Sequence, residues 1–177
     1  MQHACSTRLL VEVPFTSADV ALLERAHSLW NHYLPCTTSS SQLSCVSLLY
    51  LFNGRCRSAE SIDACEHAEH LARTSGPVRD CFADVRVQDA RLSGRADTYD
   101  KHRRSAAWTM GPNNLFHRAV ASARQQGFTH MLQLEPDVIP FRAGWADRAQ
   151  RLAELSDAWI IGSALQANCT IDDMVST

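Results

Sequence analysis

The sequence lacks several features that would place it in a common class. Among its 177 residues, no apolar run approaches the ~18 residues that a membrane-spanning helix requires. Its formal net charge is −2, so it has no basic excess with which to hold a nucleic-acid backbone. The first residues, MQHACSTRLLVEVPF, are too polar for a signal peptide. We therefore expect neither a membrane span in this chain nor a nucleic-acid partner.

Glycine is missing where a dinucleotide-binding domain would need it. Such a domain carries G-x-G-x-x-G directly after its first strand, because the backbone must approach a pyrophosphate closely there. The segment that follows the first apolar run here is VPFTSADV, which contains no glycine. This class of nucleotide-binding enzyme is therefore excluded.

Cysteine, by contrast, is abundant for an intracellular chain of this size. None of the cysteines forms a C-x-x-C pair, and they stand at positions 5, 36, 45, 56, 65, 81 and 169. Disulfide bonds formed in a secretory compartment would account for the number, although an odd count leaves at least one cysteine unpaired. The tripeptide Asn168-Cys169-Thr170 also fits an N-glycosylation sequon. These features favour a lumenal location, such as the Golgi, over the cytosol.

Two further hypotheses arise from the cysteines and histidines. Cys56, Cys65, His67 and His70 are potential zinc ligands, but structural zinc sites start from tighter C-x₂₋₄-C spacings. We expect instead a solvated helix face with two structural cysteines. A Cys/His nucleophilic enzyme is disfavoured as well, because the sequence places no nucleophile on a recognisable elbow or helix start.

Strand and helix patterns alternate along the chain. Short apolar runs predict strands, and apolar positions at helical spacing predict helices between them. A polar stretch over 88–104 has no periodicity and is typical of a functional or mobile loop. We expect strands at 8–15, 45–52, 82–87, 130–134 and 159–163, and helices at 20–33, 61–74, 114–125 and 144–155. This order predicts a single α/β domain over 1–177, a three-layer αβα sandwich with a mainly parallel sheet.

Two acids follow the strand HMLQL, in the sequence Glu135-Pro136-Asp137. In open parallel sheets, ligands bind beyond the carboxyl ends of the strands. Acidic residues at such an end are therefore candidates for a binding site. Carboxylate oxygens suit Mg²⁺ or Mn²⁺, which neutralise a diphosphate and stabilise it as a leaving group. We expect Asp137 to bind the metal directly, and Glu135 to reach it through water or to contact a ribose. On spacing alone, a strand end with two solvated acids is the favoured interpretation.

The segment MGPNNLFHRAVASARQQGFTHMLQLEPDVIPFRAGW resembles the core of the GT-A-type glycosyltransferases. In that family a Gly/Asn-containing turn opens a helix, followed by a hydrophobic strand and a D-x-D motif. The motif detail covers 110–146 and the element order covers 8–165, but the first acid here is Glu135. The resemblance implies a GT-A-like fold, a Mn²⁺ or Mg²⁺ cofactor and a UDP- or GDP-linked sugar donor. The acceptor, whether a glycan, a protein or a small molecule, is left open.

The resemblance also implies further donor contacts. The end of the first strand and the end of the second meet the nucleoside in this family, and the region before the motif helix meets ribose and phosphates. The matching residues here are Phe15, Thr16, Asn53, Lys101, Arg104, Asn113 and Asn114, with Glu135. Each is also compatible with ordinary turn or helix-cap chemistry. Trp108 and Trp145 flank the proposed site and could stack on a ligand, although aromatic side chains are more often core.

Two function classes therefore remain open. The first is a metal-dependent glycosyltransferase, and the second is a GT-A-like module that binds without transferring sugar. The chain ends at Thr177, only 40 residues beyond Asp137, and we expect it to be truncated relative to the family. A catalytic base cannot be assigned, so inverting and retaining chemistry both stay open. A GT-A-like nucleotidyltransferase is disfavoured, because that family places a Gly-rich basic loop where VPFTSADV stands.

Overall fold

A computed structural model describes residues 5–37, 45–59, 61–74, 76–97 and 110–157 of the chain. Strands and helices alternate within them, as the sequence predicts. The strands are β1 (Leu9–Phe15), β2 (Val46–Phe52), β3 (Asp84–Asp89) and β4 (His130–Gln133). The helices are α1 (Val20–His32), α2 (Ile62–Arg73), α3 (Pro77–Asp80), α4 (Met110–Gln125) and α5 (Trp145–Leu155), with 3-10 turns at Ser17–Asp19 and Gly94–Asp97.

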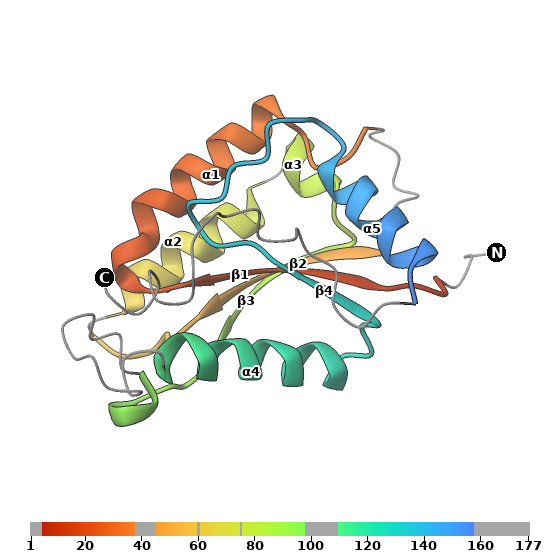
Figure 1. The fold of residues 1–177 in the computed structure, drawn as a ribbon. Helices are drawn as coiled ribbons and strands as arrows, with labels where there is room; N and C mark the ends of the chain where they lie inside the picture. Colours follow the sequence, from red (N-terminus) through yellow and green to blue (C-terminus); the bar gives the residue numbers. More distant parts are fainter. Residues whose placement is uncertain (1–4, 38–44, 60, 75, 98–109, 158–177) are drawn as a thin grey trace, which may run out of the picture.

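The four strands form one parallel sheet in the order β3-β2-β1-β4. Figure 1 shows α1, α2, α3 and α5 above this sheet and α4 below it. This arrangement confirms an α/β fold with a parallel sheet between two helical layers. The strand order has a further consequence. The chain moves outward from β1 to β3, and α4 then returns it across the opposite face to β4, on the other side of β1.

Apolar packing on both faces of the sheet explains why the sequences of the central strands are almost continuous hydrophobic runs. All residues of β1 and β2 are buried, which is typical of parallel strands covered by helices on each side. Alternate side chains of β1 enter two separate cores. Leu9, Val11, Val13 and Phe15 pack under α1 and α2, whereas Leu10 packs with residues of α4. Glu12 shares the α4 side and is fully buried in the middle of the strand.

Most of the expected elements lie within a few residues of their predicted bounds. The largest shift is in α4, which begins at Met110 and not near 114, because Pro112 is accepted in its first turn. The edge strand β3 continues to Asp89, into the stretch expected to be a loop. The rest of that stretch beyond Asp97, and the strand expected at 159–163, lie outside the described residues.

Three disulfide bonds connect six of the seven cysteines. They join Cys5 to Cys45, Cys36 to Cys81 and Cys56 to Cys65. Because Cys56 and Cys65 are bonded to each other, they are structural and not a pair of free zinc ligands, as expected. His67 instead faces Glu24 on α1, with 3.1 Å between Nε2 and Oε1. Cys169 lies outside the described residues.

None of the helices that the structure describes is both long and apolar enough to cross a bilayer.

Candidate functional site

The reversal of strand order makes the junction of β1 and β4 the expected place for a ligand. At such a topological switch point, the connections leave the sheet in opposite directions and open a crevice beyond the carboxyl ends of the strands. Two pockets adjoin the carboxyl end of β1, one of about 320 Å³ between the ends of β1 and β2 and one of about 90 Å³ between the ends of β1 and β4. Thr16 borders both, so the two pockets are neighbours along one edge.

The larger of these, which we call the β1–β2 pocket, is organised around Asn53. The side-chain amide of Asn53 donates a 2.7 Å hydrogen bond to Oδ1 of Asp97. Its backbone N–H donates to the Phe15 carbonyl at 3.0 Å, and its own carbonyl accepts from the Leu92 N–H at 2.8 Å. Asn53 is therefore fixed by three contacts from three segments of the chain. The pocket is lined by Thr16, Ser17, Ala18, Phe52, Asn53, Gly54, Arg55, Ser58, Ser61 and Asp97.

One wall of the β1–β2 pocket is a short loop that is held by internal hydrogen bonds and by a disulfide bond. The Arg55 carbonyl accepts hydrogen bonds from the hydroxyl groups of Ser58 at 3.2 Å and Ser61 at 2.5 Å. The Cys56–Cys65 disulfide fastens the same loop to α2. The exposed Arg55 side chain is thus carried on a constrained segment at the mouth of a polar pocket.

The smaller pocket, the β1–β4 pocket, contains the first acid of the sequence motif. Gln133 donates from Nε2 to Oε1 of Glu135 at 3.0 Å, and both residues line the pocket. Pro112 and Leu115, in the first turns of α4, form the opposite wall. Asp137 is exposed and borders neither of the two pockets. The structure therefore brings Glu135 to the switch point, whereas Asp137 lies outside the pocket lining.

Thr16 and Phe15, two of the residues expected to contact the nucleotide, have side chains that stabilise the fold. The Thr16 hydroxyl donates to Asp19 at 2.7 Å and accepts from the Ala18 N–H at 3.2 Å, so it caps the turn Ser17–Asp19. The Phe15 side chain is 1% exposed and packs on Phe52, with 5.2 Å between ring centroids. Phe15 can therefore offer a ligand its main chain, not its ring.

The other residues expected to contact the donor lie in different parts of the structure, and some lie outside the described residues. Asn114 donates from Nδ2 to the Ala96 carbonyl at 3.0 Å, which ties α4 to the turn that carries Asp97. Asn113 is exposed in the first turn of α4. Trp145 packs against Trp30 with 5.3 Å between ring centroids, as part of the core rather than the site. Lys101, Arg104 and Trp108 lie outside the described residues.

Sequence inspection missed Glu12, the most unusual group near the site. Its side chain is 0% exposed, and neither carboxyl oxygen has a hydrogen-bond partner. Burial, and secondarily the charge of Glu135, raise the pKa of Glu12 to about 8. The available signal was an acid at the centre of the apolar run LLVEVPF.

The donor set at this edge fits a divalent cation bound to a diphosphate. No three His, Cys, Asp or Glu side chains of the described residues gather into a complete metal site. Mg²⁺ seldom uses such an all-protein cage, and is usually held by one or two carboxylates together with water and substrate phosphates. At the β1–β4 pocket, Glu135 supplies one hard carboxylate ligand of this kind.

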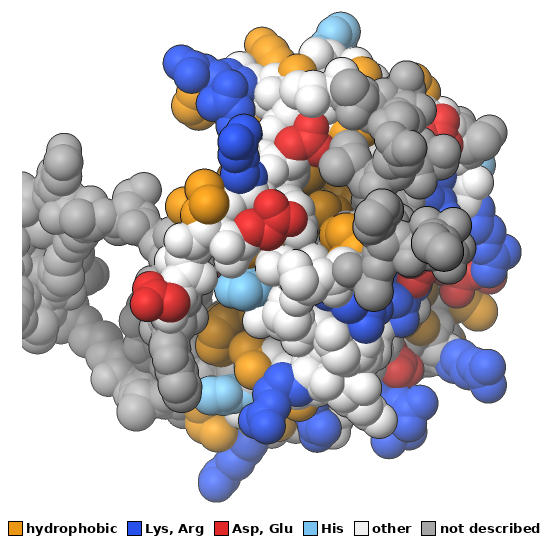
Figure 2. Space-filling model, turned by 90° about the vertical axis from the view of Figure 1, so that its right-hand side faces the viewer, with side chains coloured by type: hydrophobic (Ala, Val, Ile, Leu, Met, Phe, Trp, Pro, Cys, Tyr) orange, Lys and Arg blue, Asp and Glu red, His pale blue; other side chains and the backbone are white. Residues whose placement is uncertain are grey.

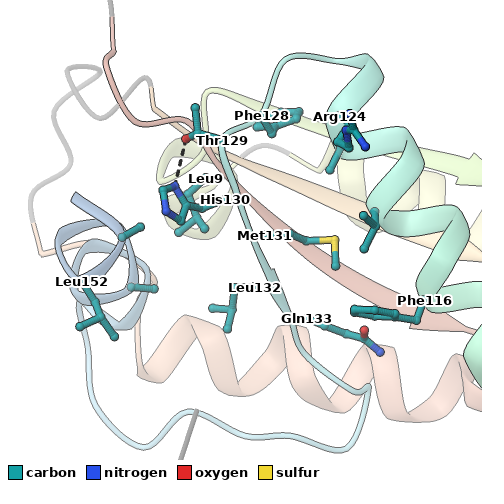
Figure 3. A pocket seen from close by; sticks show the side chains of 14 residues that line it. Leu9, Phe116, Arg124, Phe128, Thr129, His130, Met131, Leu132, Gln133 and Leu152 are labelled. Atoms are coloured by element: carbon teal, nitrogen blue, oxygen red, sulfur yellow. Dashed lines mark hydrogen bonds between the residues drawn. The ribbon is translucent and has the colours of Figure 1, made fainter. Parts of the chain in front are cut away.

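A pocket larger than the two at the end of β1 lies beside the outer edge of β4 and shares Gln133 with the β1–β4 pocket. It has a volume of about 390 Å³ between α4 and α5 and is lined mainly by apolar side chains, including Phe116, Met131 and Leu152 (Figure 3). Figure 2 shows apolar side chains in a hollow on the molecular face turned by 90°, with Lys and Arg side chains along its lower margin. None of the described residues that line it is acidic, so among them it does not share the chemistry of the carboxyl edge.

Comparison with known protein families, with curated proteins and with solved structures found no match. The hypotheses about this site therefore depend on the residues and geometry of this chain.

Proposed function

We propose that the protein binds a nucleotide-sugar donor along the carboxyl edge of the sheet and transfers its sugar to an acceptor. The observation that carries this proposal is the pair of adjoining pockets at the carboxyl edge of the sheet, one organised by Asn53 and Asp97 and the other containing Glu135. The GT-A-like variety of α/β fold is part of the same proposal. It is supported by the parallel β3-β2-β1-β4 order and by the acid that follows β4.

The β1–β2 pocket is the proposed place for the nucleoside. Asp97 offers a carboxylate that accepts N–H or O–H groups of a base or ribose, and Asn53 holds it in position. A polar pocket with a few fixed hydrogen-bonding groups is what orientation of such a ligand needs. Thr16, which borders both pockets, marks the path that a diphosphate would follow towards Glu135.

The metal would be held by Glu135 and Asp137, as the sequence hypothesis has it. When bound, it would supply the positive charge that stabilises the departing nucleoside diphosphate. Of the two acids, Glu135 borders the β1–β4 pocket and is positioned beside Gln133. This chain's own contribution is to fix the nucleoside at one end of the edge and to place carboxylates at the other.

The experiment is isothermal titration of UDP and GDP into the protein, first with Mn²⁺ and then with EDTA, followed by a donor-hydrolysis assay. We expect one nucleotide to bind in a metal-dependent manner, and the substitution Asp97→Asn to weaken it. Glu66→Gln is the matched control, because Glu66 is an exposed carboxylate on α2 and lines neither pocket. Nucleotide binding without hydrolysis or transfer would favour the non-catalytic module, and no binding of either nucleotide would contradict the proposal.

A further inference from the structure

Asp97 is the sole acidic residue among the described residues that line the β1–β2 pocket, and its side chain is held in place. The Asn53 amide donates to its Oδ1 atom at 2.7 Å. Asn53 itself is only 9% exposed, and its main chain is hydrogen-bonded to Phe15 and Leu92. The Asp97 carboxylate is therefore presented to the pocket from a fixed point.

The same contact determines how the Asn53 amide is oriented and what Asp97 still offers. An ionised carboxylate can only accept hydrogen bonds, so Asn53 directs Nδ2 towards it. A carboxylate has about four lone-pair sites, and Asn53 uses one of them. No other described residue donates a hydrogen bond to Asp97 or forms an ion pair with it. Among the described residues, both oxygens of Asp97 thus keep acceptor sites for a ligand.

A carboxylate with two accepting oxygens matches a ligand that presents two hydrogen-bond donors side by side. Guanine does so, with N1–H and the N2 amino group on its Watson–Crick edge. In uracil the single N–H lies between two carbonyl oxygens. In adenine and cytosine the amino group lies beside a ring nitrogen that accepts. Each of these three bases would bring an acceptor against one carboxylate oxygen, and a buried acceptor without a donor is unfavourable.

The position of Asp97 along the edge favours contact with the base over contact with the ribose. In a nucleoside diphosphate the ribose lies between the base and the phosphates. Thr16 borders both pockets, whereas Asp97 lines the β1–β2 pocket but not the β1–β4 pocket. With the diphosphate towards Glu135, the ribose would lie nearer Thr16 and the base nearer Asp97. Arg55 also lines this pocket, and its guanidinium N–H groups suit the O6 and N7 acceptors of guanine.

We propose that the Asp97 carboxylate, oriented by Asn53, accepts hydrogen bonds from N1–H and the N2 amino group of guanine and so selects a GDP-linked donor. The inference rests on the proposed function, which places the nucleoside in this pocket, and adds the identity of the base. Asp97 is the specificity-determining residue, and Asn53 is a positioning residue that acts through it.

The test is isothermal titration of GDP, IDP and UDP into the protein at one Mn²⁺ concentration. IDP differs from GDP only in lacking the N2 amino group. We expect GDP to bind about tenfold more tightly than IDP, and more tightly still than UDP, because a site built for ligand N–H groups rejects bases that lack them.

Asp97→Asn provides a change of specificity and not merely a loss of affinity. The new amide still accepts from N1–H, but its NH₂ group would face the N2 amino group of guanine, whereas it can donate to the C2 carbonyl of xanthine. The variant should therefore bind XDP more tightly than GDP, the reverse of the wild type. Glu66→Gln, an exposed carboxylate on α2 that lines neither pocket, should keep the wild-type order.

Equal binding of GDP and IDP by the wild type would overturn the inference, and this comparison decides even if Asp97→Asn fails to fold. An equal loss of GDP and UDP affinity in the folded variant would also overturn it, because Asp97 would then bind the ribose. The proposed function fails separately. Metal-dependent binding of UDP in preference to GDP would leave the donor site in place and reject the guanine contact. Guanine-selective binding that needs Asp97, without metal dependence, donor hydrolysis or transfer, would support the guanine contact and reject the transferase.

Discussion

Asn53, at the end of β2, donates a 2.7 Å hydrogen bond to the Asp97 carboxylate, which follows it by 44 residues. This contact joins the second strand to the 3-10 turn Gly94–Asp97, and Asn114 joins the same turn to α4 through the Ala96 carbonyl. Two of these segments, the end of β2 and the turn, line the β1–β2 pocket together with the residues that follow β1. Such convergence at the carboxyl edge is the arrangement on which ligand recognition by parallel sheets depends.

We first predict that Asp97→Asn weakens nucleotide binding about tenfold, which corresponds to about 1.4 kcal/mol. The Asn side chain can still accept the hydrogen bond from Asn53, so the fold is retained, but the charge that attracts ligand N–H groups is lost. Titration calorimetry measures the affinity, and circular dichroism checks the fold. An affinity equal to that of the Glu66→Gln control would remove Asp97 from the binding site.

A second prediction concerns Asp137, which is exposed beyond the β1–β4 pocket. Asp137→Asn should remove the metal-assisted part of donor binding and leave stability within about 0.5 kcal/mol of wild type, as is usual for surface substitutions. The measurement is nucleotide affinity with Mn²⁺ and with EDTA. If Mn²⁺ increases the affinity of the variant as much as that of the wild type, Asp137 is not a metal ligand.

The parallel sheet could be predicted from sequence because its central strands are continuous apolar runs. LLVEVPF and VSLLYLF become β1 and β2, both buried throughout. The edge strand β3 is half-buried and polar in part, so its end at Asp89 carried no clear signal. The start of α4 was missed because Pro112 and Asn113 resemble a helix cap, whereas the structure places them inside the first turn.

The candidate site could be predicted only in part, because its contacts join distant segments. Glu135 was predicted from its place after an apolar strand, whereas Asn53 was predicted from the family resemblance, which assigns the end of the second strand to the nucleoside. The Asn53–Asp97 pair has no local pattern, since Asp97 lies in a polar stretch without periodicity. Glu12 was hidden because an apolar run tolerates one acid without changing the predicted strand. Whether that acid has a partner depends on the packing of α4 and β4 around it.

A third prediction concerns the wall of the β1–β2 pocket. Replacement of both Cys56 and Cys65 by Ser should lower the free energy of unfolding by about 2–3 kcal/mol, because the bond closes a short loop. The same change should weaken nucleotide binding, since Arg55, Ser58 and Ser61 line the pocket on this loop. Urea unfolding measures the first effect and calorimetry the second. A loss of stability without any loss of affinity would show that the loop does not shape the ligand site.

Peptide mapping without reduction provides a direct test of the linkages themselves. We expect peptides that join Cys5 to Cys45, Cys36 to Cys81 and Cys56 to Cys65. Of these, Cys36–Cys81 connects the segment after α1 to the residue after α3, and both of its cysteines are buried. It should therefore resist mild reduction longest. Recovery of Cys56 linked to any other cysteine would contradict the loop described above.

The last prediction follows from the pKa of Glu12, which burial and the charge of Glu135 raise from 4.5 to about 8. Below pH 4.5 the group is protonated in both the folded and the unfolded chain, so it does not make stability depend on pH. Between pH 4.5 and about 8 the unfolded chain releases the proton while the folded chain retains it. The free energy of unfolding therefore falls as pH rises, by up to about 1.4 kcal/mol per pH unit from this group, and the fall ends above the folded pKa.

Urea unfolding in EDTA at pH values from 5 to 9 isolates this contribution, if the wild type is compared with Glu12→Met at each pH. Other titrating groups are common to both proteins, so the difference between the two curves reports Glu12. We expect the variant to gain on the wild type steadily up to about pH 8, and the difference to be constant beyond it. Parallel curves over the whole range would mean that Glu12 is solvated or paired in the folded protein. Its carboxyl would then not be a partnerless buried group in the folded protein.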